Sequence, residues 1–264
     1  MTKIIFFGNG PLADYTLNTL KSNGCEIIFH AREKSDLEEV RHLKSADTSG
    51  ELHGVLASFG VIIKNDVLGL FEPEGILNIH PSLLPKYRGP SPIESAILSR
   101  DTEFGVSVMK LAPAMDAGPI YFQTSITLER PIKDDVYRLL ATSGANWLAQ
   151  NIEHLPTPSP QDNTNATYTQ KFDKSMSPLD PEHHTATELD CQVRAFAGFP
   201  KSKFSFFGLD CIIISAHVAS IKEKDDAHTL YIQCHDGSRL IIDEIQPAGR
   251  KAMNAKSFLN GYAR

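Results

Sequence analysis

The chain has 264 residues, of which 41% are hydrophobic and 22% charged, and its formal net charge at pH 7 is -6. This length allows one large domain or two smaller ones that each bury a core, and the net negative charge argues against a surface coated for nucleic acid. No apolar stretch approaches the length of a membrane span, and the apolar part of the N-terminal MTKIIFFGNG is too short for a signal peptide, so we expect a cytoplasmic protein.

The first half of the chain alternates short, apolar, β-branched runs with amphipathic stretches. This alternation predicts an α/β fold with a Rossmann-like, mostly parallel sheet and helices on both faces. The expected strands are residues 3–7, 26–30, 54–58, 75–79, 105–111 and 120–126. The expected helices between them are residues 12–22, 34–43, 65–70, 92–99 and 134–155.

A glycine-rich turn follows the first expected strand. Gly8, Gly10 and Ala13 fit the pattern G-x-G-x-x-A of dinucleotide-binding folds. Glu33 lies twenty residues beyond Ala13, where such folds carry an acidic residue. However, Pro11 removes one N–H donor from the loop that would hold a pyrophosphate. The pattern therefore favours a tight strand-to-helix turn, with a nicotinamide or flavin dinucleotide site as an alternative.

The fourth expected strand runs into NIHPSLLPKYRG, residues 78–89. Asn78 and His80 are two positions apart on a strand, so their side chains point to the same face. An amide donor and an imidazole at the end of a strand suit the stabilisation of an oxyanion and the transfer of a proton. Asp116, in the turn LAPAMDAGPI, is a third candidate. Without a Ser or Cys elbow beside them, we expect the nucleophile to come from a substrate.

The second half of the chain differs from the first in composition and in its pattern of apolar residues. It opens with PTPSPQDNTNATYTQ, which predicts a linker over residues 156–184 and a catalytic α/β domain over residues 1–155. Residues 185–264 begin with a helix to about residue 197 and continue with four or five short strands, which predict a small barrel or sandwich. The four isolated cysteines are interpreted as buried thiols, and no metal site is expected.

Two runs of residues now become recognisable. NIHPSLLPKYRGPSPIESAI, followed by GVSVMKLAPAMDAGPI, resembles the family of 10-formyltetrahydrofolate-dependent formyltransferases, whose signature is N-x-H-x-S-L-L-P-x-x-R-G-x-x-P and a D-x-G loop. Further along, ATYTQKF and IQPAGRKAMNAKSFL resemble the members that act on initiator methionyl-tRNA, the methionyl-tRNA formyltransferases. The resemblance covers nearly the whole chain and implies that the C-terminal domain is a small, OB-like β-barrel.

The resemblance also implies roles for individual residues. Asn78 and His80 would hold and polarise the formyl oxygen, while Asp116 would orient His80 and help take up a proton. The acceptor would contact Arg88, Arg250 and Lys251. The co-substrate 10-formyltetrahydrofolate would contact three segments, made of Phe59, Gly60, Val61, Ile62 and Ile63, of Ser82, Leu83, Leu84 and Pro85, and of Met115, Ala117 and Gly118. The implied protein is a monomer that formylates the α-amino group of initiator methionyl-tRNA, without a metal and without a membrane.

The sequence departs from the tRNA-acting members in two places. Those proteins usually carry a basic, glycine-rich insertion after the second strand, whereas HAREKSDLEEVRHLKSADTSGELHG makes a short, partly acidic connection. The residues Pro81 and DAGPI resemble more closely the sequences of members that formylate glycinamide ribonucleotide or sugar amines. The alternative acceptor is therefore an amine on a nucleotide-linked sugar or another small molecule. A binding module without catalysis is a further alternative, which predicts that replacing Asn78 and His80 changes nothing.

Overall fold

The computed structural model describes residues 1–220 and 229–262, and residues 221–228 and 263–264 of the expected C-terminal domain lie outside the described part. The chain forms two compact units. Unit 1 comprises Met1–Ile93, Thr102–Arg130 and Asp134–Lys171, so it includes residues 156–171 of the expected linker. Unit 2 comprises Glu94–Asp101, Pro131–Lys133 and the described residues from Phe172 onward.

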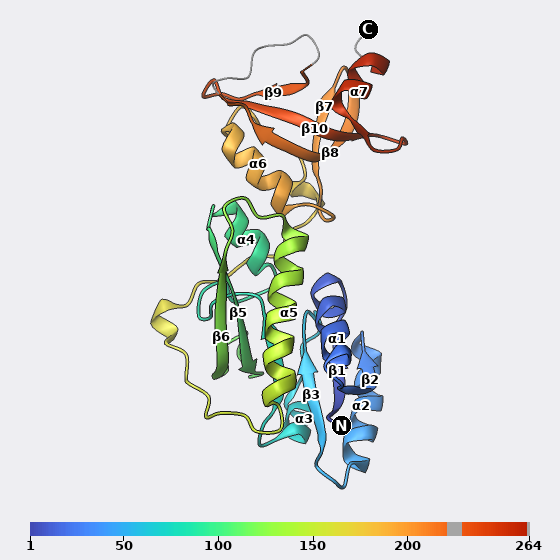
Figure 1. Ribbon diagram of the computed structural model, residues 1–264, viewed down its shortest axis with the longest axis vertical. Coiled ribbons are helices and arrows are strands. Elements are labelled where there is room, and N and C mark those ends of the chain that lie inside the picture. The colour runs from blue at the N-terminus through green and yellow to red at the C-terminus, as the bar shows by residue number, and fades with distance from the viewer. Residues whose placement is uncertain (221–228, 263–264) are drawn as a thin grey trace. The chain divides into compact units, whose positions relative to one another are not determined.

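A six-stranded sheet forms the centre of unit 1, in the order β2-β1-β3-β4-β5-β6 (Figure 1). The strands from β2 to β4 pair in parallel, whereas β5 and β6 are added antiparallel. The sheet confirms the expected Rossmann-like fold. In such sheets, ligands bind beyond the carboxyl ends of the strands, near the point where the strand order reverses, here between β1 and β3. The strands are β1 Lys3–Phe7, β2 Glu26–Ala31, β3 Leu52–Leu56, β4 Ile76–His80, β5 Glu103–Lys110 and β6 Ile120–Thr127.

Helices cover both faces of this sheet, as expected. On one face, Phe7 belongs to a buried cluster with Val40 of α2 and Val67 of α3. On the other face, α5 comes so close at Gly144 that a Cβ there would lie 2.9 Å from a methyl group of Ile79. None of the helices in the described residues is long and apolar enough to cross a membrane. The helices of unit 1 are α1 Pro11–Ser22, α2 Leu37–Ala46, α3 Asn65–Leu68 and α5 Lys133–Asn151, and most of α4 Pro92–Leu98 belongs to unit 2.

Two of the expected helices have other bounds than predicted, since α2 begins later and α5 ends earlier. Residues 34–36 form a separate 3₁₀ turn before α2, because the Asp36 carboxylate accepts hydrogen bonds from the N–H groups of Arg32 and Glu33. Helix α5 ends at Asn151 rather than at residue 155. Pro156 follows shortly after, and the residue before a proline disfavours the helical conformation.

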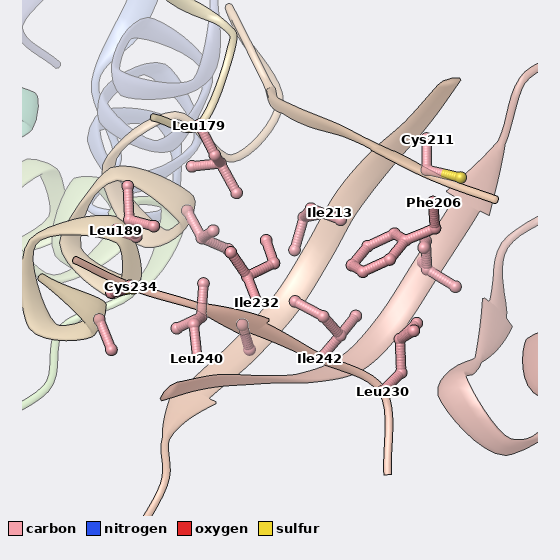
Figure 2. Close-up of a cluster of buried hydrophobic side chains, with 14 of the residues drawn as sticks. Leu179, Leu189, Phe206, Cys211, Ile213, Leu230, Ile232, Cys234, Leu240 and Ile242 are labelled. Carbon is pink, nitrogen blue, oxygen red and sulfur yellow. The ribbon is translucent and has the colours of Figure 1, made fainter. Parts of the chain in front are cut away.

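Unit 2 is built around a curled antiparallel sheet in the order β11-β10-β8-β7, with β9 paired to β10. Figure 2 shows Phe206, Ile213 and Ile242 converging from β7, β8 and β10 in the buried core of this unit. The sheet and the preceding helix confirm the expected small β-domain, and Thr185 and Glu188 form the capping box of α6. Its elements are α6 Ala186–Ala195, β7 Ser202–Phe206, β8 Leu209–Val218, β9 Tyr231–Gln233, β10 Arg239–Pro247, β11 Met253–Asn254 and α7 Ala255–Tyr262.

All four cysteines are buried and free, as the sequence predicts. Burial raises the pKa of each thiol above its ordinary value, because the thiolate is poorly solvated in an apolar environment. These cysteines are therefore packing residues with low reactivity at neutral pH.

Candidate active site

The polar end of β4 opens into a cavity of about 220 Å³ at the carboxyl edge of the sheet in unit 1. Asn78 and His80 both line this cavity and are only 4% and 5% exposed. Asp116 reaches the same cavity from the loop between β5 and β6. The three polar residues that the sequence singled out therefore meet in one place. The remaining lining residues are Leu12, Leu56, Ser58, Phe59, Gly60, Ile79, Pro81, Gly89, Pro90, Pro92 and Tyr137.

The hydrogen bond of His80 to the backbone fixes which ring nitrogen carries the proton. Nε2 lies 3.0 Å from the carbonyl oxygen of Tyr87. A carbonyl oxygen can only accept, so Nε2 carries a hydrogen and donates it. The neutral ring then has its lone pair on Nδ1, which lies 3.7 Å from Oδ2 of Asp116. Nδ1 is therefore the ring nitrogen that faces the Asp116 carboxylate, while Nε2 is occupied by the Tyr87 carbonyl.

Asp116 is held rigidly on its loop. Its Oδ2 accepts a hydrogen bond from the Gly89 N–H at 2.7 Å. Its φ of 46° lies in the left-handed region, which Asp tolerates better than most residues. Two positions on, a Cβ at Gly118 would lie 1.8 Å from the carbonyl oxygen of Lys110, so only glycine allows the loop to lie this close to β5. These constraints hold the carboxylate facing His80.

The sequence of the chain matches known family models over both of its halves. A family model described as "Formyl transferase" matches residues 16–152, and one described as "Formyl transferase, C-terminal domain" matches residues 172–263. The chain belongs to the formyl transferase family. It is 34% identical over 221 residues to the methionyl-tRNA formyltransferase of Roseiflexus castenholzii, covering 79% of this chain and 70% of that protein. It is 34% identical over 244 residues to the methionyl-tRNA formyltransferase of Granulibacter bethesdensis, covering 85% and 76%.

Solved structures of distant relatives share the fold of this formyl transferase. HypX from Aquifex aeolicus, in complex with tetrahydrofolic acid, is 16% identical with a TM-score of 0.76. The comparison covers 100% of this chain and 48% of HypX, so the chain spans about half of that protein. The N-formyltransferase from Helicobacter canadensis, in complex with folinic acid and dTDP-3-aminofucose, is 18% identical with a TM-score of 0.66, covering 94% of this chain and 99% of that one.

The segment that follows β3 has one buried side and one exposed side. Phe59 is 3% exposed and contacts Phe7 edge to face, with ring centroids 5.6 Å apart. Gly60 also lines the cavity, with a φ of 69° that favours glycine. Ile63 is buried beside them, whereas Val61 is partly exposed and Ile62 is 86% exposed. Of the five residues expected at the folate, Phe59 and Gly60 thus line the cavity.

The second expected folate segment, residues 82–85, does not line the cavity. Instead, the Ser82 hydroxyl donates to the carbonyl oxygen of Lys86, and Ser107 donates to the Ser82 carbonyl at 2.6 Å. Leu83 packs against Gly105, and the Leu84 N–H donates to the Ser107 hydroxyl at 3.1 Å. Pro85 follows Leu84 through a cis peptide bond. This segment therefore forms the packed base of the loop that ends at Gly89.

The third expected folate segment flanks Asp116. Met115 is 61% exposed, Ala117 is partly exposed and Gly118 is buried. None of the three lines the cavity. Ile62 and Met115 are two of the large apolar side chains exposed on this chain. Both come from loops that carry cavity residues, namely Gly60 and Asp116.

Arg88 was expected to contact the acceptor, but it is 2% exposed and its guanidinium is directed at protein groups. It donates to Oε1 of Gln161 at 2.6 and 3.1 Å, to Oδ1 of Asn163 at 2.8 Å and to the Tyr168 hydroxyl at 3.3 Å. Sequence reasoning missed Gln161, because a single glutamine in a proline-rich run gives no periodic signal. The other two expected acceptor residues, Arg250 and Lys251, are exposed in unit 2 between β10 and β11.

The glycine pattern after β1 has a structural explanation. A Cβ at Gly8 would lie 2.1 Å from the carbonyl oxygen of Ala57 and 2.9 Å from the Cβ of Ala13. Glycine is therefore needed for the close approach of this turn to the end of β3. Glu33 accepts a hydrogen bond from the Ser35 hydroxyl in the turn before α2. In residues 1–220 and 229–262, no three His, Cys, Asp or Glu side chains are grouped to hold a metal ion.

Proposed function

We propose that this formyl transferase moves the formyl group of 10-formyltetrahydrofolate to the α-amino group of initiator methionyl-tRNA. The observation that carries the formyl-transfer step is the convergence of Asn78, His80 and Asp116 on one cavity. An amide donor, an imidazole and a carboxylate can stabilise a negative oxygen and move a proton, while the acceptor amine supplies the nucleophile. The cytoplasmic location expected from the sequence belongs to the same proposal.

The cavity has the two kinds of surface that a folate co-substrate needs. Leu12, Leu56 and Phe59 supply apolar walls, which suit a flat heteroaromatic ring. Asn78 and His80 supply the polar end, where the reactive formyl group would lie. Ligand sites commonly combine an apolar lining with a few polar groups that fix orientation. The pterin-bearing relatives named above share this fold, which supports the same co-substrate here.

In the proposed mechanism, each polar residue has a separate task. Asn78 donates a hydrogen bond to the formyl oxygen as negative charge develops on it. His80 accepts a proton on Nδ1 from the attacking amine, since Nε2 is already committed to the Tyr87 carbonyl. Asp116 compensates the positive ring from 3.7 Å. His80 then returns the proton to the folate nitrogen as its bond to the formyl carbon breaks.

The choice of acceptor rests on other parts of the chain. Relatives at 34% identity are methionyl-tRNA formyltransferases, and the match to the family's C-terminal domain extends over residues 172–263. A sugar-linked amine is the second candidate. The tRNA-acting members usually carry a basic insertion after the second strand, whereas here only the short turn of residues 32–36 separates β2 from α2. The fold is also shared with the Helicobacter canadensis enzyme bound to dTDP-3-aminofucose.

A direct acceptor assay tests the proposal. The protein is incubated with 10-formyltetrahydrofolate and either charged initiator tRNA or a nucleotide-linked amino sugar, and formylated product is measured. We expect formyl-methionyl-tRNA and loss of product when Asn78 or His80 is replaced by alanine. Removing one oxyanion donor typically lowers kcat by about 10²- to 10³-fold. Formylation of the sugar and none of the tRNA overturns the assigned acceptor, and full activity of both alanine variants overturns the assigned site.

A further inference from the structure

Gln161 lies in the segment between α5 and α6, and its side-chain amide sits between two loops of the cavity. Its Oε1 accepts from the Arg88 guanidinium, 3.1 Å from Nε and 2.6 Å from Nη2. Its Nε2 donates to the carbonyl oxygens of Asp116 at 2.8 Å and Gly118 at 2.7 Å. A glutamine amide offers two donor hydrogens and one acceptor oxygen with two lone pairs, so every hydrogen-bonding position is used.

These contacts close a ring of hydrogen bonds around Asp116. Gln161 holds the Asp116 backbone from one side, and the Gly89 N–H holds its carboxylate from the other at 2.7 Å. Gly89 directly follows Arg88, whose guanidinium is bound to Gln161. The loop that carries Asp116 and the loop that carries Gly89 are therefore tied together through Gln161. Displacing this amide removes the side-chain contacts that tie the two loops together beside the Asp116 carboxylate, while the backbone of Arg88 stays paired with Thr167 and Thr169.

We propose that Gln161 is a positioning residue for formyl transfer, acting through Asp116. By bridging the Arg88 loop to the Asp116 loop, it sets the distance of 3.7 Å between the Asp116 carboxylate and His80 Nδ1. This inference rests on the proposed function of the His80–Asp116 pair. The segment that the sequence marks as a linker thus supplies part of the site's support, although Gln161 does not line the cavity.

Two substitutions separate the two halves of the bridge. Gln161→Glu has nearly the same shape and keeps an acceptor for Arg88, but it turns a carboxylate oxygen toward the carbonyl oxygens of Asp116 and Gly118. Gln161→Ala removes both halves. Asn163→Ala is the matched control, because Asn163 accepts from Arg88 at 2.8 Å and belongs to the same segment but makes no hydrogen bond to the Asp116 loop.

The test measures kcat, the KM for 10-formyltetrahydrofolate and the thermal unfolding midpoint of each variant. We expect both Gln161 variants to lose about 10- to 100-fold in kcat, as misplacement of a reacting group commonly does, while KM changes less than kcat. Asn163→Ala should stay within about twofold of wild type. If Gln161→Ala fails to fold, the kcat of Gln161→Glu still tests the inference. A Gln161→Glu protein with the wild-type kcat overturns the inference.

A double-mutant cycle distinguishes positioning from a general structural role. If Gln161 acts through Asp116, adding Gln161→Glu to Asp116→Asn lowers kcat little further, because the group being positioned is already disabled. Losses that multiply in the double variant overturn the inference. Failure of the proposed function looks different: in that case the wild-type protein formylates neither acceptor, or His80→Ala is fully active, and the inference falls with it.

Discussion

Replacing Asp116 with asparagine tests the electrostatic part of the site. Asn is isosteric with Asp and keeps an oxygen that can accept from the Gly89 N–H, so the loop should retain its shape. The substitution removes the negative charge that faces His80 Nδ1 across 3.7 Å. We expect kcat to fall, because the ring no longer has a counter-charge when it accepts a proton from the attacking amine.

The size of the effect follows from the geometry. Two unit charges about 4 Å apart interact by roughly 4 kcal/mol at an effective dielectric constant of about 20 and by roughly 1 kcal/mol in water. The side chains of His80 and Asp116 are 6% and 16% exposed, which places the pair between these limits. An interaction energy of about 2–3 kcal/mol, in the middle of this range, is lost when the charge is removed. This loss corresponds to about a 30- to 150-fold decrease in kcat.

The assay is steady-state formylation at saturating acceptor, with the concentration of 10-formyltetrahydrofolate varied. We expect the loss in kcat and a KM for the folate that stays within about threefold of wild type, since Asp116 acts on the proton rather than on ground-state binding. Asp66→Asn is the matched control, because Asp66 is an exposed aspartate of the same unit paired with Arg41 and does not line the cavity. An Asp116→Asn enzyme with kcat within threefold of wild type would refute the reasoning.

Three further changes have defined outcomes. Ser107→Ala should lower the free energy of unfolding by about 2–3 kcal/mol in denaturant titration, because it leaves a buried backbone N–H and the Gln123 amide without the hydroxyl they now contact; an unchanged midpoint would contradict this. Ile62→Ser should raise the KM for the folate without lowering the unfolding midpoint, since this side chain is 86% exposed, and an unaltered KM removes Ile62 from the folate site. Burial alone would raise the pKa of Asp47, but hydrogen bonds from Lys44 and neighbouring donors lower it well below its usual range. The contribution of the ionised Asp47 to stability is therefore present above about pH 4 and is lost as the pH falls further. The difference in thermal unfolding midpoint between wild type and Asp47→Asn should narrow below about pH 4. A difference that stays constant with pH would contradict this prediction.

The sheet and the position of Asn78 and His80 could be predicted because they depend on short-range periodicity. Short apolar, β-branched runs identified all six strands of unit 1, and the two-residue period of a strand placed both polar side chains on one face. The approach of Asp116 to His80 also agrees with the family resemblance, and the structure brings the two side chains to 3.7 Å. Their catalytic roles stay predictions.

Contacts between distant parts of the chain could not be predicted in the same way. The family resemblance assigned Arg88 to the acceptor, yet the structure buries Arg88 and pairs it with Gln161, which lies 73 residues further along the chain. Helix α7 was not among the expected elements, although the sequence carries a capping residue for it. Asn254 accepts from the Ser257 N–H at 2.8 Å, and Phe258 and Tyr262 stack one helical turn apart.

The anchoring of residues 161–168 by Arg88 has a consequence for protein engineering. Exchanging C-terminal modules between formyl transferases is an obvious route to new acceptor specificity, and the proline-rich run from Pro156 looks like a natural splice point. A chimaera cut there would separate Arg88 from the amide and hydroxyl groups that satisfy its buried guanidinium. The junction that preserves the parent enzyme's chemistry lies after Lys171, where unit 1 ends.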